Sequence, residues 1–249
     1  MQQPALRAAG LQLRREAPGG RSLTIALLCH DERRNLERYL PVAEGFVSRW
    51  SGGGEVLVVD DGSSDGTAEW VGARGGTVSA VRHPRRRGYG AAVRTAFAAA
   101  RGDYVATVDG DGQFDLAELT GLLSLLEEGP ADLVGGIRAL RRDSLHRRAL
   151  GATYNALMRW VTETSWADLD CGFKVGRRAA LHGLGLRCDG NLVGAELYAK
   201  AERSGLRIRQ APVTHRPRVE GRAKGADAFA IGGAFVEFVR WFDVLRPPR

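Results

Sequence analysis

The stretch Tyr104–Asp111, YVATVDGD, carries the clearest structural signal in the chain. Its first six residues form a short, largely apolar run rich in β-branched side chains, which is typical of a buried strand. Asp109, Gly110 and Asp111 come directly after the apolar residues, and Asp and Gly are also common in plain turns. Two carboxylates one residue apart at a strand end can both reach one Mg²⁺ or Mn²⁺ ion, and Gln113 can add an amide oxygen. The stretch therefore predicts a strand that ends in a metal site.

The same unit recurs on both sides of this stretch, because short apolar runs alternate with helical segments. We expect strands at 23–29, 55–60 and 77–81 and helices at 31–47, 67–73, 91–100 and 116–128. Such alternation predicts a mostly parallel sheet with helices on both faces. Ligands of these sheets bind beyond the carboxyl ends of the strands. Asp60-Asp61 and Asp109-Gly110-Asp111 both fall at that edge.

The second half of the chain is less regular and contains no internal repeat or long linker. We expect further strands at 132–134, 171–175 and 206–213 and helices at 148–161 and 193–204. The domain organisation that follows is a flexible leader at 1–22, one catalytic domain at 23–225 and an amphipathic tail at 226–249.

Composition limits the class of protein. The chain has 249 residues, of which 44% are hydrophobic and 26% charged, as in soluble globular proteins. Its net charge of +7 comes almost entirely from arginine and favours anionic surfaces or phosphate-bearing ligands. Three scattered cysteines predict neither a disulfide framework nor a zinc cluster. We find no apolar run of about 20 residues and no secretory signal, so we expect a cytoplasmic location.

The segment Asp60–Thr67, DDGSSDGT, allows two interpretations. In the first, it is a strand-to-helix turn in which Asp65 or Thr67 caps the next helix. In the second, the Asp61 carboxylate accepts hydrogen bonds from a nucleoside base or ribose. Neighbouring buried carboxylates are costly unless they meet donors, which favours a ligand at this edge.

The order of the motifs along the chain is more specific than any one of them. They are CHDERRNL (29–36), VVDDGSSDGT (58–67), RGYGAA (87–92), VDGDGQF (108–114), DLDCGFK (168–174) and APVTHRPRVEGRAK (211–224). From about Leu23 to Lys224 the sequence resembles the family 2 glycosyltransferases, and among them the dolichol- and polyprenyl-phosphate mannose or glucose synthases. His30 departs from the resemblance, because it stands where the family usually has an aromatic residue. Many relatives also carry transmembrane helices after the catalytic domain.

The resemblance implies a GT-A fold, which is a Rossmann-like α/β fold, and a nucleotide-sugar substrate used with Mg²⁺ or Mn²⁺. The site residues it implies fall into four groups. The nucleotide-sugar is assigned to Glu32, Asp61, Asp109, Gly110 and Asp111, and the metal to Asp109, Asp111 and Gln113. Phosphate and acceptor contacts are assigned to Arg138, Arg147, Arg148, His215, Arg218 and Lys224, and catalysis to Asp111, Asp168 and Asp170. Asp168 and Asp170 act as a base toward a hydroxyl acceptor in one interpretation, and orient the arginines in the other.

Three functional hypotheses follow. The first is an inverting, metal-dependent hexosyltransferase that moves mannose or glucose from GDP-mannose or UDP-glucose to a polyprenyl phosphate, peripherally bound at the inner membrane face. The second is a soluble glycosyltransferase acting on a hydroxyl of a natural product or another small acceptor. The third, suggested by charge alone, is a non-enzymatic module that binds an anionic surface or nucleic acid. We expect no nucleic-acid partner, because no recognition motif is present and acidic strand ends repel phosphate.

Overall fold

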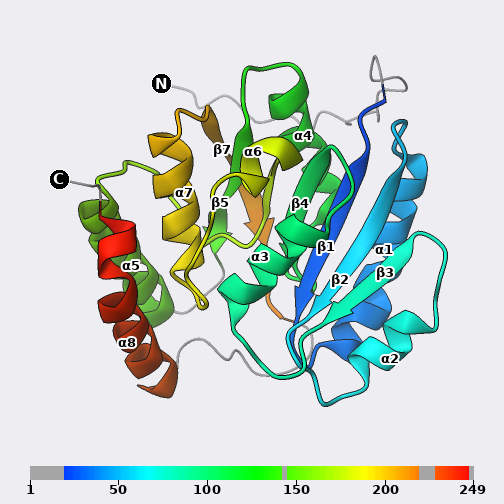
Figure 1. Ribbon diagram of the computed structural model, residues 1–249, viewed down its shortest axis with the longest axis horizontal. Helices are drawn as coiled ribbons and strands as arrows, with labels where there is room; N and C mark the ends of the chain where they lie inside the picture. Colours follow the sequence, from blue (N-terminus) through cyan, green and yellow to red (C-terminus); the bar gives the residue numbers. More distant parts are fainter. Residues whose placement is uncertain (1–19, 142–144, 219–227, 247–249) are drawn as a thin grey trace, which may run out of the picture.

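The computed structural model describes residues 20–141, 145–218 and 228–246, and it describes side chains in these ranges except at 139–150 and 228–235. A seven-stranded sheet lies between helices (Figure 1). Its strands are β1 (Leu23–Cys29), β2 (Gly54–Asp60), β3 (Val78–Arg82), β4 (Tyr104–Asp109), β5 (Leu133–Arg141), β6 (Lys174–Arg177) and β7 (Ile208–His215). The helices are α1 (Arg33–Arg49), α2 (Thr67–Gly72), α3 (Tyr89–Ala99), η1 (Leu116–Glu118), α4 (Leu119–Glu127), α5 (Leu145–Thr162), α6 (Arg178–His182), α7 (Val193–Arg203) and α8 (Ala228–Leu245).

The strand order is β3-β2-β1-β4-β6-β5-β7. β1 pairs in parallel with β2 and β4, β2 with β3, and β5 with β7. β6 is antiparallel to both of its neighbours, β4 and β5. All strands other than β6 therefore end at one edge of the sheet. The predicted mostly parallel sheet is confirmed, whereas the reversed strand between β4 and β5 was not foreseen.

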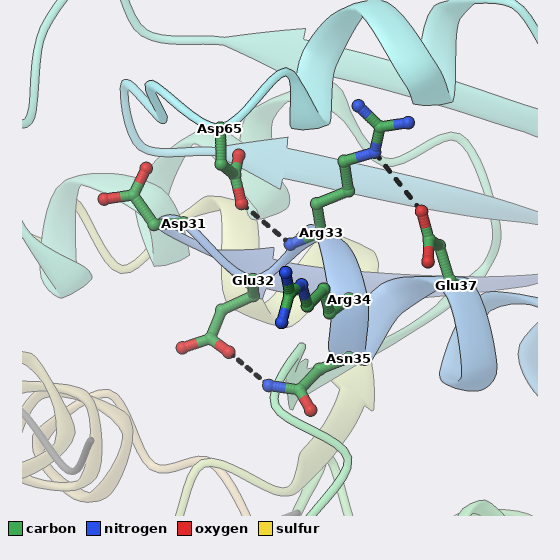
Figure 2. Close-up of a pocket in the computed structure, with 7 residues that line it drawn as sticks. All are labelled: Asp31, Glu32, Arg33, Arg34, Asn35, Glu37 and Asp65. Carbon is green, nitrogen blue, oxygen red and sulfur yellow. Dashed lines mark hydrogen bonds and ion pairs between the residues drawn. The ribbon is translucent and has the colours of Figure 1, made fainter. Parts of the chain in front are cut away.

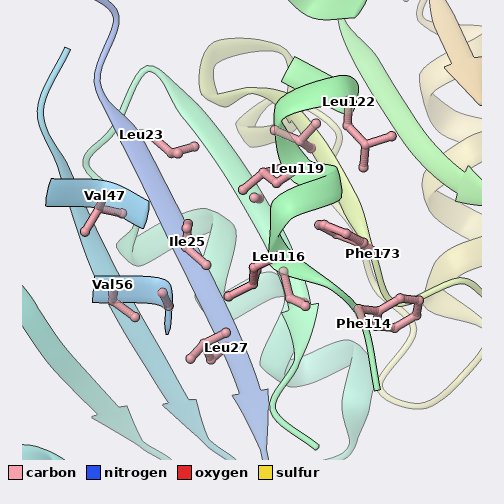
Figure 3. Packing of buried hydrophobic residues seen from close by; sticks show 14 of the residues in the cluster. Leu23, Ile25, Leu27, Val47, Val56, Phe114, Leu116, Leu119, Leu122 and Phe173 are labelled. Carbon is pink, nitrogen blue, oxygen red and sulfur yellow. The ribbon is translucent and has the colours of Figure 1, made fainter. Parts of the chain in front are cut away.

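Alternate residues of the strands point to opposite faces, as the pleat requires. Leu23, Ile25 and Leu27 of β1 pack in one core cluster with side chains from α1, η1 and α4. Figure 3 shows these three side chains on the sheet face that Leu116 and Leu119 cover. Ala26 and Leu28 face the other way and pack with side chains from α3, α7 and α8. Burial of both sheet faces explains why the strands read as continuous apolar runs.

Two elements extend further than the sequence pattern predicts. β5 continues to Arg141 instead of ending at Val134, and α5 begins at Leu145. The sequence pattern missed the short α6.

Helix α8 packs on the domain. Phe238, Trp241 and Phe242 pack against the core cluster on the α3 side of the sheet, and Leu245 is part of it. The Glu237 carboxylate accepts a hydrogen bond from the backbone N–H of Gly190. These three aromatic side chains are therefore used for packing. Within the described residues, no helix combines the length and apolar character that crossing a membrane requires.

Candidate active site

The acidic residues that follow β1, β2 and β4 lie at one edge of the sheet, because these three strands are neighbours and run in parallel. Gly110 makes the turn after β4 possible. Its N–H donates to the Leu28 carbonyl at 2.8 Å, and a Cβ at this position would be crowded by the Leu28 oxygen and the Cys29 side chain. The turn is therefore packed against β1. Gly110 separates Asp109 from Asp111 along the chain.

Asp109 is an acid whose ionised form is disfavoured by its surroundings. Burial raises its pKa to about 7, the charges of Asp111 and Asp170 act in the same direction, and Lys174 opposes them. The hydroxyl of Tyr89 also lowers the pKa of Asp109. The Asp109 Oδ1 atom is buried without a hydrogen-bond partner in the described part of the chain. Such an atom costs free energy until a ligand supplies a cation or a donor.

These features fit a divalent cation. Gly172 packs so closely on Asp109 that a Cβ at position 172 would overlap the Asp109 carboxylate. Asp111 supplies a second carboxylate two residues after Asp109. No group of three or more Asp, Glu, His or Cys side chains forms a ready-made metal cluster among the residues that the structure describes. Mg²⁺ commonly takes one or two carboxylates from the protein and its other oxygens from water and substrate phosphates. Two aspartates are therefore a sufficient share from the protein.

Arg218 bridges two of the predicted site residues. Its Nη1 donates to Glu32 Oε1 at 2.8 Å and its Nη2 donates to Asp111 Oδ2 at 2.7 Å. Burial lowers the pKa of Arg218, but the hydrogen bond and charge of Asp111 outweigh burial and raise it overall. A cation of the chain itself thus neutralises the carboxylates where metal and nucleotide are expected.

Gln113 links the turn after β4 to the segment after β7 by hydrogen bonds. Its Nε2 donates to the Arg216 carbonyl at 2.7 Å, and the Arg216 N–H donates to the Gln113 carbonyl at 2.8 Å. These bonds hold the turn after β4 against the segment that carries Arg218. The amide nitrogen makes this contact, and the predicted role of the amide oxygen as a metal ligand remains a prediction.

A pocket of about 580 Å³ opens beside Glu32, at the start of α1 (Figure 2). Asp31, which has a positive φ of 52°, connects the segment after β1 to the loop after β2. Its N–H donates to Ser63 Oγ at 2.8 Å and its Oδ1 accepts from the Ser64 N–H at 2.8 Å. Glu32 Oε2 accepts from Asn35 Nδ2 at 2.6 Å. The pocket lining consists of Asp31, Glu32, Arg33, Arg34, Asn35, Glu37 and Asp65.

Asp61 is occupied by contacts within the chain. Its carboxylate accepts from the backbone N–H groups of Arg87 and Gly88, both at 2.8 Å, and lies 2.7 Å from His83 Nδ1. The Asp61 side chain therefore holds the loop between β3 and α3. Its predicted contact with a nucleoside remains a prediction.

His83, in the loop after β3, is buried. The residue is 3% exposed, and its Nε2 lies 2.9 Å from Thr95 Oγ1. The ring connects Asp61 to α3. A histidine next to Pro84 gave no local sign of burial, because both of its partners come from other elements.

Arg138, within β5, meets Asp168 in a forked ion pair. Its Nε and Nη2 donate to the two carboxylate oxygens of Asp168 at 2.8 Å each, and Nη2 also donates to Asp170 Oδ2 at 3.3 Å. Burial alone would lower the pKa of Arg138, but the Asp168 and Asp170 contacts raise it overall. Asp168 orients the arginine here, while the Asp170 side chain is 40% exposed.

The remaining predicted phosphate-binding residues are less informative. The His215 ring packs edge-on against Phe114, with ring centroids 5.1 Å apart. The side chains of Arg147 and Arg148 and the whole of Lys224 lie outside the described residues, as does most of the predicted leader.

The motifs also contain residues whose roles were missed. Tyr89, in RGYGAA, lowers the pKa of Asp109 through its hydroxyl. Lys174, in DLDCGFK, is 6% exposed and donates to the Cys171 carbonyl, and its charge counteracts the rise in the Asp109 pKa. Both residues lay in stretches that the resemblance had marked, but local sequence gave no sign that they support Asp109.

Comparison with known proteins identifies the family. The Glycosyl transferase family 2 profile matches residues 29–185. An uncharacterized glycosyltransferase of Mycobacterium bovis is 32% identical over 230 residues, which are 91% of this chain and 99% of that protein. The undecaprenyl-phosphate 4-deoxy-4-formamido-L-arabinose transferase of Serratia proteamaculans is 30% identical over 68% of this chain. This chain spans 52% of the length of that transferase.

Solved structures show the same fold. Glucosyl-3-phosphoglycerate synthase of Mycobacterium tuberculosis in complex with phosphoglyceric acid superposes with a TM-score of 0.69 at 22% identity. The match covers 92% of this chain and 82% of that one. The same enzyme in complex with Mn²⁺, UDP-glucose and phosphoglyceric acid gives a TM-score of 0.68. The predicted GT-A fold is confirmed, and the non-enzymatic hypothesis is wrong. This chain belongs to glycosyltransferase family 2.

Proposed function

We propose that the protein transfers a hexose, mannose or glucose, from a nucleotide-sugar to a polyprenyl phosphate at the cytoplasmic face of a membrane. The observation that carries the proposal is the buried, unpartnered Asp109 Oδ1 beside Asp111, with Arg218 and Arg138 at the same sheet edge. Carboxylates beside arginines suit a substrate that brings a metal-bound diphosphate and a second phosphate. The similarity to a transferase named for undecaprenyl phosphate supports the acceptor class.

Each group of residues has a role in this reaction. Glu32 and the pocket beside it receive the nucleoside. Asp109 and Asp111 hold the divalent cation, which when bound neutralises charge on the leaving diphosphate. Arg218 leaves its two carboxylates and forks onto phosphate oxygens, because guanidinium matches them bidentately.

The transfer itself is a displacement at the anomeric carbon. An oxygen of the acceptor phosphate forms the new C–O bond while the bond from the anomeric carbon to the nucleoside diphosphate breaks. Because the attack comes from the opposite face, the configuration at the anomeric carbon is inverted. The acceptor phosphate is already ionised and needs no general base. Arg138, held by Asp168, orients the phosphate that attacks.

Arg218 makes the proposed exchange testable. In Arg218→Gln we expect the donor-free chain to bind Mn²⁺ about tenfold more tightly, because a competing charge-assisted bond to Asp111 is lost. Turnover should fall about tenfold, since the same side chain then cannot contact the diphosphate. Mn²⁺ titration followed by electron paramagnetic resonance measures the first effect, and nucleoside diphosphate release measures the second.

Arg216→Gln is the matched control. Arg216 lies two residues away and its Nη2 pairs with Asp115 Oδ2 at 2.6 Å, away from Glu32 and Asp111. This variant loses the same charge and should leave Mn²⁺ affinity unchanged. Equal Mn²⁺ affinities in Arg218→Gln and the wild type would contradict the exchange.

Asp170 supports a second candidate function. Its carboxylate is partly exposed and only weakly engaged by Arg138, so it can accept a proton from a hydroxyl acceptor. The fold similarity to an enzyme crystallised with phosphoglyceric acid is compatible with a small acceptor. In this alternative the protein glycosylates a hydroxyl of a small molecule.

The two candidates differ in what stimulates turnover. We would measure nucleoside diphosphate release from GDP-mannose and UDP-glucose with Mn²⁺, with and without a short polyprenyl phosphate. We expect strong stimulation by the lipid phosphate with one of the two donors. Metal-dependent release that ignores the lipid and responds to phosphoglyceric acid or another hydroxyl acceptor would support the second candidate instead.

A further inference from the structure

Three consecutive arginines, Arg85, Arg86 and Arg87, occupy the loop between β3 and α3. All three are exposed. Within the described residues, none of their side chains has a hydrogen bond, an ion pair or a ring contact. Arginines on neighbouring elements behave differently, since Arg82 pairs with Glu69 and Arg74 with Glu44. Adjacent like charges without counter-charges repel each other. Binding of an anionic partner to this loop relieves that repulsion and therefore lowers the free energy.

The backbone of this loop is fixed although its side chains project into solvent. Asp61 accepts from the N–H groups of Arg87 and Gly88, and the buried His83 connects Asp61 to Thr95 of α3. The loop also packs on Gly62, where a Cβ would overlap the backbone of Arg85 and Arg86. The arginines are therefore presented at a defined place, with little loop entropy to lose on binding.

The position of the loop relates it to the active site. β3 pairs in parallel with β2, so the loop follows β3 at the same sheet edge as Asp109 and Asp111. A partner bound to the three arginines would therefore lie at the same edge of the sheet as Asp109 and Asp111.

We propose that Arg85, Arg86 and Arg87 form a docking surface for an anionic phospholipid bilayer, which sets the catalytic edge of the sheet against the headgroups. The inference rests on the proposed function, because a polyprenyl phosphate presents its phosphate at that level. Guanidinium groups suit lipid phosphates, which they bind through several donors. Single-stranded nucleic acid fits less well, since it needs exposed aromatic rings for stacking, and the aromatic residue next to the loop, Tyr89, is partly buried.

Vesicle co-sedimentation tests the surface without relying on catalysis. The wild type should bind vesicles of phosphatidylcholine mixed with phosphatidylglycerol and should ignore vesicles of phosphatidylcholine alone. In the double variant Arg85→Gln/Arg86→Gln we expect affinity for the mixed vesicles to fall about 25-fold, as two charges near an anionic leaflet contribute about fivefold each. Metal-dependent release of nucleoside diphosphate without lipid should be unchanged.

The control is Arg49→Gln/Arg209→Gln. Arg49 ends α1 and Arg209 lies near the start of β7, so both exposed residues sit toward the opposite edge of the sheet. This variant loses the same net charge and should keep vesicle binding.

Three outcomes would overturn the docking surface. They are equal losses in both double variants, no binding of the wild type to mixed vesicles, and binding of a single-stranded oligonucleotide in preference to vesicles. The proposed function fails on a different observation, namely the absence of stimulation by polyprenyl phosphate, so the two failures are distinguishable.

Discussion

Replacing Asp109 by asparagine should lower metal-dependent nucleoside diphosphate release about 1000-fold, equivalent to about 4 kcal/mol of transition-state stabilisation. The substitution keeps the shape of the side chain and the space beside Gly172 but removes the charge that Mn²⁺ needs. Mn²⁺ affinity, measured without donor, should fall in the same variant. The pKa of Asp109, raised to about 7 by burial, shows how poorly the chain alone supports this charge.

Glu128→Gln provides the comparison for this effect. Glu128 is exposed at the end of α4, before β5 begins, and so lies at the opposite edge of the sheet. It loses the same charge and should retain full turnover and Mn²⁺ affinity. An Asp109→Asn enzyme with turnover near that of Glu128→Gln would remove Asp109 from the proposed metal site.

Replacing Arg138 by methionine should lower the free energy of unfolding by about 3 to 5 kcal/mol, because it removes the guanidinium charge that pairs with the buried Asp168 carboxylate. The two side chains are only 12% and 7% exposed, so water cannot replace the lost hydrogen bonds. Urea unfolding measures the change. The double variant Arg138→Met/Asp168→Leu should recover most of the loss, since it removes the stranded charge as well.

Arg207→Met tests whether burial of the ion pair causes the large loss of stability expected for Arg138→Met. Arg207 also forks onto a carboxylate, with Nε and Nη2 at 3.0 and 3.1 Å from Asp132, but the arginine side chain is 59% exposed. Solvent screens such a pair, so its loss should cost much less than the loss of Arg138. Equal destabilisation by the two substitutions would contradict the role of burial.

Much of the architecture follows from the order of residues along the chain. The apolar runs at Leu23–Cys29 and Tyr104–Asp109 match β1 and β4, because strands buried on both faces must be apolar throughout. The acidic residues directly after them reach one edge, since parallel strands share the direction of their carboxyl ends. The motifs that mark this edge also matched the family correctly. Sequence could predict these features because each depends on neighbours a few residues apart.

The partners of the site side chains depend on the tertiary structure. Arg218 reaches Glu32 from 186 positions away, and the reversed β6 brings Lys174 near Asp109. Local sequence could not reveal that Asp61 holds the loop of Arg87, or that His83 is buried between Asp61 and Thr95. Hydrophobic periodicity determines which residues are buried along a strand or helix, whereas the pairing of long polar side chains depends on how distant elements pack. For this protein, sequence by itself determined the mostly parallel sheet and the edge at which its acidic residues gather. Only packing decided that Arg218 neutralises Asp111 while Asp109 Oδ1 has no hydrogen-bond partner among the described residues.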